Sequence, residues 1–335
     1  MRHALRLEEL VVGRRVVVRH RLPGGAASDA LGELVAADAE RLVVATRRGE
    51  VVVARRDVLA AKGVPPAPSR AARTGTARTG AARTGAEALE LVAAEHWRPV
   101  EREDLGAWRL RAAGGFTGRA NSALAVGDPG CDLDTALTRV REFYAARGLD
   151  AVVAAPTGAL TQELERRGWQ VRTPSLVMTA TLDPSPDPSL QAEAAPTGLR
   201  LDDEPGDAWL ASYQGRGPVG EVGRRVLLSA DEQVFVSLRD DDGEVLAIAR
   251  GSLSRGGGPG TGGSWLGLSA VETAPAHRRK GLASTVTAAL LAWGARRGAG
   301  RAFLQVAVVN DPARALYERA GFRVHHEYRY LVGPD

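Results

Sequence analysis

The chain reads RRKGLA at Arg278–Ala283, between an apolar strand pattern that ends near Thr273 and a helical pattern that runs to about Arg297. Small residues at Gly281 and Ala283 allow the backbone to approach a ligand closely. The N–H groups at the start of a helix, together with the helix dipole, attract anions. This arrangement predicts a phosphate-binding turn, to which the basic side chains add positive charge.

A second motif follows about thirty residues later, where the chain reads NDPARALYERAGF at Asn310–Phe322. Pro312 suits the first turn of a helix, and Gly321 suits the residue that follows the last turn. Helical and strand patterns fill the interval between the two motifs. The region therefore has the alternation that is typical of an α/β unit.

Together the two motifs resemble those of the GNAT superfamily of acetyl-CoA-dependent N-acyltransferases. The resemblance is fullest over residues 265–330 and extends back to about 195. It implies a catalytic domain at 191–335 that uses acetyl-CoA as cosubstrate and transfers the acetyl group directly to a primary amine, on a small molecule or on a protein. Such a transfer needs a base, a donor for the oxyanion and an acid for the thiolate, so no metal is implied.

The resemblance also implies a role for each site residue. Tyr317 would protonate the leaving thiolate. Glu272 is the candidate general base, because alternation along the strand points its side chain to the face opposite to those of Val271 and Thr273. The equal alternative is that Glu272 is an ordinary strand carboxylate, solvated or in a salt bridge. The residues expected to contact the cofactor are Val271 and Thr273 on the strand, Arg278, Arg279, Lys280, Gly281, Leu282 and Ala283 in the turn, and Asn310 beside the pantetheine arm.

The sequence from residue 87 onward contains an internal repeat with an offset of roughly 150 residues. Where the second copy has Arg278–Ala283, the first has Gly127–Gly130, with an acidic residue and no basic one. Leu164 aligns with Tyr317, and leucine cannot donate a proton. Residues 87–190 are therefore predicted to be a degenerate GNAT-like half without cofactor binding, while generic α/β alternation is the other reading of the repeat.

Residues 1–63 predict five short strands separated by turns, in a spacing that resembles an SH3-like β-barrel. Asp57–Lys62 is expected to form a closing helical turn. Residues 64–86 repeat Arg-Thr-Gly three times and have no apolar periodicity, so they predict a disordered linker. The fold class expected is thus α/β (α+β), with a barrel before tandem mixed-sheet halves, and this order resembles a bacterial subgroup of acetyltransferases.

The 335 residues carry a formal net charge of +4, which is unevenly distributed. Residues 1–86 have an excess of eight basic groups, so a weakly bound acidic partner is expected there. A nucleic-acid-recruiting module is therefore one alternative function, although this segment has no aromatic residue on which bases would stack. A non-catalytic acyl-CoA-binding regulator is another alternative, against which Tyr317 argues.

Composition also predicts where the protein resides. No apolar run approaches the length of a membrane span, and the first residues lack the apolar core of a secretory signal. The single cysteine, Cys131, cannot form an internal disulfide. We therefore expect a cytoplasmic protein without a membrane partner, and the sequence gives no indication of its oligomeric state.

Overall fold

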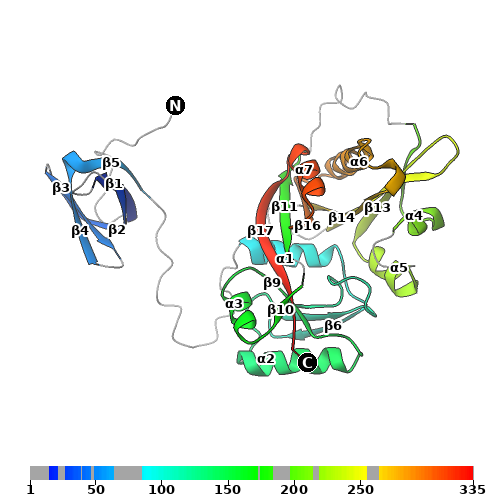
Figure 1. Ribbon diagram of the computed structural model, residues 1–335, viewed down its shortest axis with the longest axis horizontal. Coiled ribbons are helices and arrows are strands. Elements are labelled where there is room, and N and C mark those ends of the chain that lie inside the picture. The colour runs from blue at the N-terminus through cyan, green and yellow to red at the C-terminus, as the bar shows by residue number, and fades with distance from the viewer. Residues whose placement is uncertain are drawn as a thin grey trace. The chain divides into compact units, whose positions relative to one another are not determined.

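The computed structural model describes residues 15–21, 27–38, 40–46, 49–63, 85–172, 174–183, 197–213, 219–254 and 264–334. The chain divides into two compact units, Met1–Ala81 and Ala82–Asp335. Each unit is described by itself (Figure 1).

The first unit is a five-stranded antiparallel sheet with the strand order β4-β3-β2-β1-β5. Alternate residues of its strands face inward and form a small core around Val18, Leu34, Leu42 and Val44. Most of the predicted linker lies outside the described residues. The five strands are β1 (Arg15–Arg21), β2 (Ala27–Ala37), β3 (Arg41–Thr46), β4 (Gly49–Ala54) and β5 (Val58–Gly63), with a 3-10 turn at Arg55–Asp57.

The helical turn predicted at Asp57–Lys62 is wrong. Val58–Gly63 is the strand β5, which pairs with β1 and brings the last strand back against the first. Ala61 is buried in the barrel core and Val58 packs against it, so pairing with β1 overrides the local preference of an alanine-rich stretch for helix.

The second unit combines seven helices with one long mixed sheet among its described residues. The helices are α1 (Gly85–Glu95), α2 (Leu133–Ala145), α3 (Ala159–Arg166), α4 (Asp207–Ser212), α5 (Glu221–Leu227), α6 (Leu282–Arg296) and α7 (Asp311–Arg319). The strands are β6 (Glu101–Leu105), β7 (Trp108–Ala112), β8 (Ala123–Leu124), β9 (Val152–Pro156), β10 (Gln170–Val171), β11 (Ser175–Thr181), β12 (Leu199–Asp202), β13 (Glu232–Arg239), β14 (Val245–Ser254), β15 (Trp265–Thr273), β16 (Arg301–Ala307) and β17 (Arg323–Val332).

The sheet confirms the predicted pair of GNAT-like mixed-sheet halves. Its strand order is β12-β13-β14-β15-β16-β11-β17-β9-β8-β7-β6, with β10 paired to β17. Each half contains a parallel strand pair, β8 with β9 in the first and β15 with β16 in the second. The long helix of each half, α2 or α6, connects the two strands of its parallel pair.

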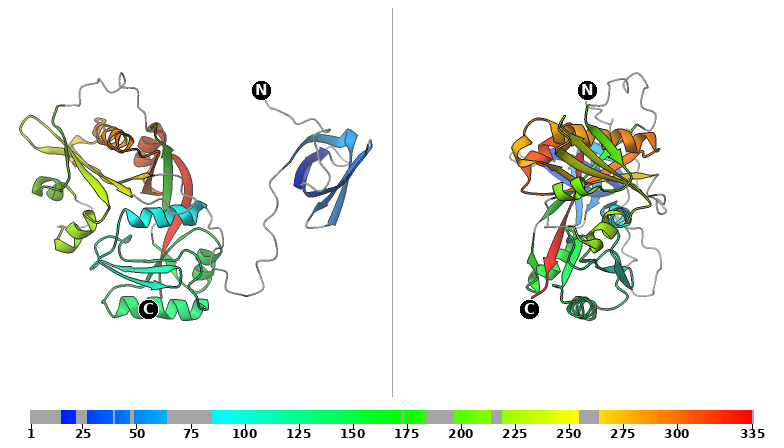
Figure 2. Two further views of the ribbon diagram at one scale, coloured as in Figure 1. Left: turned by 180° about the vertical axis from the view of Figure 1, so that it is seen from behind. Right: turned by 90° about the vertical axis from the view of Figure 1, so that its right-hand side faces the viewer.

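The two halves exchange strands. β11 precedes the predicted boundary at residue 190, yet it pairs with β16 and with β17 of the second half. In return, the end of β17 (Tyr328–Val332) pairs with β9 of the first half, and Leu331 is buried in the first half's core. Figure 2 shows β17 from two further sides as it runs from α7 towards α2. The halves therefore share one sheet, and beside the main core of each half a further cluster packs buried residues of both halves together.

Candidate active site

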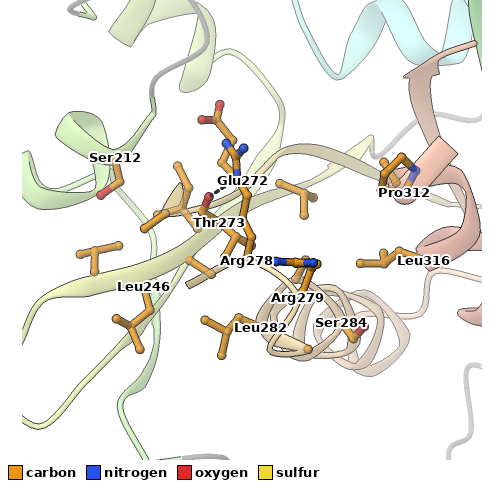
Figure 3. Close-up of a pocket in the computed structure, with 18 of the residues that line it drawn as sticks. Ser212, Leu246, Glu272, Thr273, Arg278, Arg279, Leu282, Ser284, Pro312 and Leu316 are labelled. Carbon is orange, nitrogen blue, oxygen red and sulfur yellow. Dashed lines mark hydrogen bonds between the residues drawn. The ribbon is translucent and has the colours of Figure 1, made fainter. Parts of the chain in front are cut away.

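A cavity of about 1420 Å³ lies at the end of β15, between the start of α6 and the helix α7 (Figure 3). The β13–β14 hairpin and α4 contribute the rest of its wall. The two sequence motifs, about thirty residues apart in the chain, thus meet at one cavity. It is large enough to hold a cofactor and part of an acceptor.

The turn before α6 presents backbone N–H groups to this cavity. Arg279 and Gly281 have φ values of +64° and +81°, and a Cβ atom added at Gly281 would meet nothing within 4 Å. In the described part of the chain no backbone carbonyl accepts from the N–H groups of residues 279–283, whereas Ser284 N–H donates to the carbonyl of Gly281. Free N–H groups at a helix start next to two arginines form a cradle that suits a pyrophosphate.

β15 and β16 diverge at the cavity. The two strands pair in parallel only over Trp265–Leu268 and Arg301–Leu304, although β15 continues to Thr273. Where the pairing has ended, a bulge occurs in β15, at which Ala270 has a φ of +52° and the register with β14 shifts by one residue. The divergence opens a slot beside β15 in which an extended arm would lie.

The register of β15 places Glu272 and Thr273 on opposite faces of the sheet. Glu272 is the cross-strand partner of Ile248, which packs with Trp209 of α4. Thr273 is the partner of Ala247, which belongs to the core beneath α6 and α7. The cavity is lined from both sides of this strand end, so Glu272 lies on the α4 side and the phosphate turn on the α6 side.

Tyr317 lies on α7 with its side chain 8% exposed. Its ring packs edge-on against Phe322, with 6.0 Å between the ring centroids, and burial raises the pKa of its hydroxyl to about 12. No hydrogen bond to this hydroxyl occurs within the described residues, and Tyr317 lines the cavity. Asn310 caps the same helix, because its side chain accepts from the N–H of Ala313 at 3.3 Å.

A buried arginine supports the bulge. Arg250 on β14 is fully buried and donates to two backbone carbonyls at helix ends, that of Leu227 (2.7 Å) and that of His96 (3.2 Å). It also donates to the hydroxyl of Ser269 (3.4 Å), next to the bulge, and stacks over Trp97. Burial, first of all, lowers its pKa to about 9. The negative ends of two helix dipoles thus stabilise this cation, and they come from both halves.

Most residues predicted for the site line this cavity. Lys280 does not, because its ammonium group lies 3.5 Å from the Nδ1 of His277 at the surface. Sequence reasoning missed the residues that come from α4 and from the β13–β14 hairpin, which neither motif contains, and it also missed residues within or beside the motifs to which it gave no role. The predicted residues on the lining are Val271, Glu272, Thr273, Arg278, Arg279, Gly281, Leu282, Ala283, Asn310 and Tyr317, and those missed include Ser212, Glu244, Leu246, Ser284, Leu316 and Arg319.

Comparison with known proteins places this site in a family. A family model described as "Probable histone acetyltransferase Rv0428c C-terminal" matches residues 83–331, and one described as "Rv0428c N-terminal Sm-like domain" matches residues 10–62. The chain belongs to this acetyltransferase family. It is a GNAT-type enzyme that depends on acetyl-CoA, as its two motifs predict. The matched model makes the N-terminal barrel of this acetyltransferase Sm-like, where SH3-like was expected.

One relative of the acetyltransferase matches nearly its whole length, and two others match about three quarters of it. The "Probable histone acetyltransferase Rv0428c" of Mycobacterium tuberculosis is 33% identical over 96% of this chain and 95% of its own. The "Uncharacterized N-acetyltransferase YobR" of Bacillus subtilis is 28% identical over 73% of this chain and 97% of its own. A solved GCN5-related N-acetyltransferase from Kribbella flavida shares the fold, with 18% identity, a TM-score of 0.55, and coverage of 75% of this chain and 96% of that one.

Two further features of the described residues bear on the chemistry. They contain no group of three or more histidine, cysteine, aspartate or glutamate side chains that could hold a metal ion. Nor does any helix among them have the length and apolar character needed to cross a membrane.

Proposed function

We propose that this acetyltransferase transfers the acetyl group directly to a primary amine while both substrates are bound in the same cavity. The observation that carries the proposal is the distribution of charge along the cavity. Arg279 and Arg319 lie near the phosphate turn, and the carboxylates of Glu244 and Glu272 lie towards α4 and the β13–β14 hairpin. Arg278 extends along the end of β15, where its Nε donates to the carbonyl of Thr273 at 3.4 Å (Figure 3). A pyrophosphate suits the first end and a cationic amine the second.

Acetyl-CoA would be held by the residues that fit it. The free N–H groups of the turn and the open space at Gly281 suit the pyrophosphate, and the slot beside β15 suits the pantetheine arm. When bound, it supplies an acetyl group activated as a thioester. The bulge at Ala270 frees β15 from regular pairing with β14, so a backbone N–H at Val271 would donate to the oxyanion that forms during attack.

Two side chains would handle the protons. Glu272 would accept a proton from the ammonium form of the acceptor, directly or through one water, which makes the amine nucleophilic. Tyr317 would donate a hydrogen bond to the sulfur as the C–S bond breaks. Because burial raises the pKa of Tyr317 to about 12, its proton stays on the phenol until the thiolate charge develops.

Direct transfer is favoured over a covalent enzyme intermediate. The chain has a single cysteine, Cys131, and it packs against the first half's core rather than lining the cavity. The relative from M. tuberculosis carries the word histone in its name. Lysine side chains of basic proteins are therefore the first acceptors to test, followed by polyamines, aminoglycosides and free amino acids.

Release of free thiol from acetyl-CoA, followed with this panel of amines, tests the proposal. We expect initial rates at varied concentrations of both substrates to give intersecting double-reciprocal lines, since a covalent intermediate would give parallel ones. Glu272→Gln should lower kcat by about 10²-fold, whereas Glu221→Gln, on the exposed start of α5, should leave it unchanged. Binding of coenzyme A without thiol release to any amine would favour the non-catalytic alternative.

A further inference from the structure

A second cavity, of about 480 Å³, lies between the first turns of α1 and the strands β11, β15, β16 and β17. None of its lining residues lines the acetyl-CoA cavity. It is therefore a separate feature of the molecule, and the proposed acetyl transfer does not use it.

The floor of this second cavity is made by side chains on neighbouring strands. Trp265, Arg301 and Thr181 are cross-strand partners in one row, and the Arg301 guanidinium carbon lies 5.5 Å from the centroid of the Trp265 ring. Arg323 is the cross-strand partner of Thr179, two residues further along β11. Leu89 of α1 is buried at the side wall. The cavity thus combines an apolar wall with a cationic floor.

Within the described residues the positive charge of this floor is not neutralised. None of the lining residues that the structure describes is acidic. Arg323 donates only to the backbone carbonyls of Glu318 and Phe322, and neither it nor Arg301 forms an ion pair within the described part of the chain. Two guanidinium groups without carboxylate partners at one cavity favour an anionic ligand.

His325 connects the cavity to a buried carboxylate. Its Nδ1 lies 2.8 Å from the Nδ1 of His326, whose Nε2 lies 3.0 Å from Oε1 of Glu90. The side chains of His326 and Glu90 are 10% and 6% exposed. In the tautomers that make Glu90 the acceptor, His326 Nε2–H donates to Glu90 and His325 Nδ1–H donates to His326 Nδ1. The Nε2 of His325, beside Gly85 of the cavity wall, is left as the position that can gain a proton.

Gain of that proton would be linked to binding. Burial lowers the pKa of His325, the neighbouring His326 lowers it further, and Glu90 acts in the opposite direction. The charged groups of the cavity itself are Arg301 of β16 and Arg323 of β17. An anion placed between them would favour the protonated ring, because opposite charges stabilise each other at close range.

We propose that this cavity binds a small organic anion. Its carboxylate or phosphate group would be held by Arg301, Arg323 and protonated His325. Its flat apolar part would lie against Trp265 and Leu89, which form the apolar side of the cavity. Binding would take up one proton at His325 and would therefore weaken as the pH rises.

Calorimetric titration of the full chain with phenyl phosphate, benzoate and inorganic phosphate tests this site. Saturating coenzyme A keeps the probes out of the phosphate turn. At pH 6 we expect at least one aromatic anion to bind, about tenfold more weakly at pH 8, with one proton taken up per molecule. Comparison of the affinities of phenyl phosphate and benzoate shows whether phosphate or carboxylate is preferred. Inorganic phosphate should bind most weakly, because it has no apolar part to contact Trp265.

Variants assign the binding to this cavity. Arg301→Gln and Arg323→Gln should each weaken it about tenfold, whereas Arg139→Gln, on the exposed face of α2, should not change it. His325→Asn should remove the proton uptake. Arg301, Arg323 and His325 are all exposed, so these variants should still fold. Unchanged thermal unfolding would verify this. No binding by any probe, or binding unaffected by both arginine variants, would overturn the proposal; these variants remain decisive even if coenzyme A itself does not bind.

Discussion

The two halves of the second unit end their last helix in the same way. In the second half the N–H of Phe322 donates to the carbonyl of Tyr317 at 3.0 Å, and in the first half the N–H of Trp169 donates to that of Leu164, also at 3.0 Å. The glycine before each aromatic residue has a positive φ, as the left-handed end of a helix requires. The repeat seen in the sequence is thus a repeat of backbone geometry.

The halves differ where their long helices begin. The N-cap residue of α6 is Gly281, which has no side chain to cap the helix. The N-cap residue of α2 is Asp132, whose carboxylate accepts from the N–H of Thr135 at 2.9 Å and from its hydroxyl at 2.7 Å. A carboxylate of the protein therefore occupies, in the first half, the place that a phosphate would take in the second.

The first half also closes the space around this helix start. The N–H of Ala107 and the indole of Trp108 donate to the carbonyls of Asp128 and Gly127, so the β6–β7 turn packs against the loop. Leu164 is fully buried, whereas Tyr317 lines a cavity. The first half thus keeps the GNAT-like backbone with a capped and closed helix start, at the place where the helix start of the second half is open to a cavity.

The largest effect is expected when the second half is given the helix start of the first. Gly281→Asp places a carboxylate where the pyrophosphate would bind. Because juxtaposed like charges cost several kcal/mol, affinity for acetyl-CoA should fall on the order of 10³-fold or more. Calorimetry with coenzyme A measures the change.

Gly281→Asn is the matched control. Asparagine tolerates a positive φ and has nearly the shape of aspartate without its charge, so it should lose about tenfold or less. Equal losses in both variants would show that shape and backbone strain, rather than charge, distinguish the two helix starts.

The next comparison is between two buried tyrosines, one in each half. Tyr317→Phe should lower kcat by about 10²–10⁴-fold with little change in the affinity for acetyl-CoA. The free energy of unfolding of this variant should hardly differ from that of the original protein, because the Tyr317 hydroxyl makes no hydrogen bond within the described residues. Steady-state rates and urea unfolding measure the two quantities.

Tyr144→Phe in the first half should give the opposite pattern. The hydroxyl of Tyr144 donates to the carbonyl of Arg111 at 3.0 Å and accepts from the N–H of Arg111 at 3.3 Å, and both residues are buried. Its loss should cost about 1–3 kcal/mol of stability and leave kcat unchanged. A drop in kcat in both variants would mean that activity simply follows stability.

Much of this fold could be predicted from the sequence, because its signals are local. Glycine after a helix, proline in a first turn and an apolar strand before a basic turn each act within a few residues. The exchange of β11 and β17 between the halves could not be predicted. Whether Ser175–Thr181 pairs with its own half or with Arg301–Ala307 depends on distant partners that offer equally apolar edges.

The site, too, contains residues that the sequence could predict and residues that it could not. Arg278, Gly281 and Tyr317 belong to motifs whose spacing carries the information. Ser212 and Glu244 reach the cavity from α4 and from the β13–β14 hairpin, which no spacing rule ties to the motifs. The side chain of Lys280 belongs to the motif but not to the lining, because its ammonium group lies beside His277 at the surface.

A pH-dependent effect is expected at the contact between the halves. His96 follows α1 and is 2% exposed, with its Nδ1 3.0 Å from the hydroxyl of Ser252 of the second half. Its ring packs edge-on against Phe303. Burial first, and then the charge of Arg250, lower the pKa of His96 to about 3. The folded protein therefore keeps this ring neutral.

The sign of the pH effect follows from proton binding. Below a pH of about 6.5 the unfolded chain gains a proton at His96 that the folded chain refuses until about pH 3. Stability is thus fully present above pH 6.5 and falls by up to about 1.4 kcal/mol per pH unit between the two values. His96→Gln should be less stable at pH 7.5 but have a shallower slope between pH 4 and 6. An identical slope in urea unfolding would remove His96 as its source.

The smallest effect is expected from Asp132, the N-cap residue that α2 has and α6 lacks. Asp132→Ala removes an exposed N-cap and should cost about 1 kcal/mol in the free energy of unfolding, while Asp132→Asn, an equally good cap, should cost a few tenths at most. Neither variant should bind a second coenzyme A, because the β6–β7 turn still closes the loop and the first half still lacks basic residues there. A stoichiometry of two coenzyme A molecules per chain in either variant would show that the capping carboxylate alone had kept the first half empty.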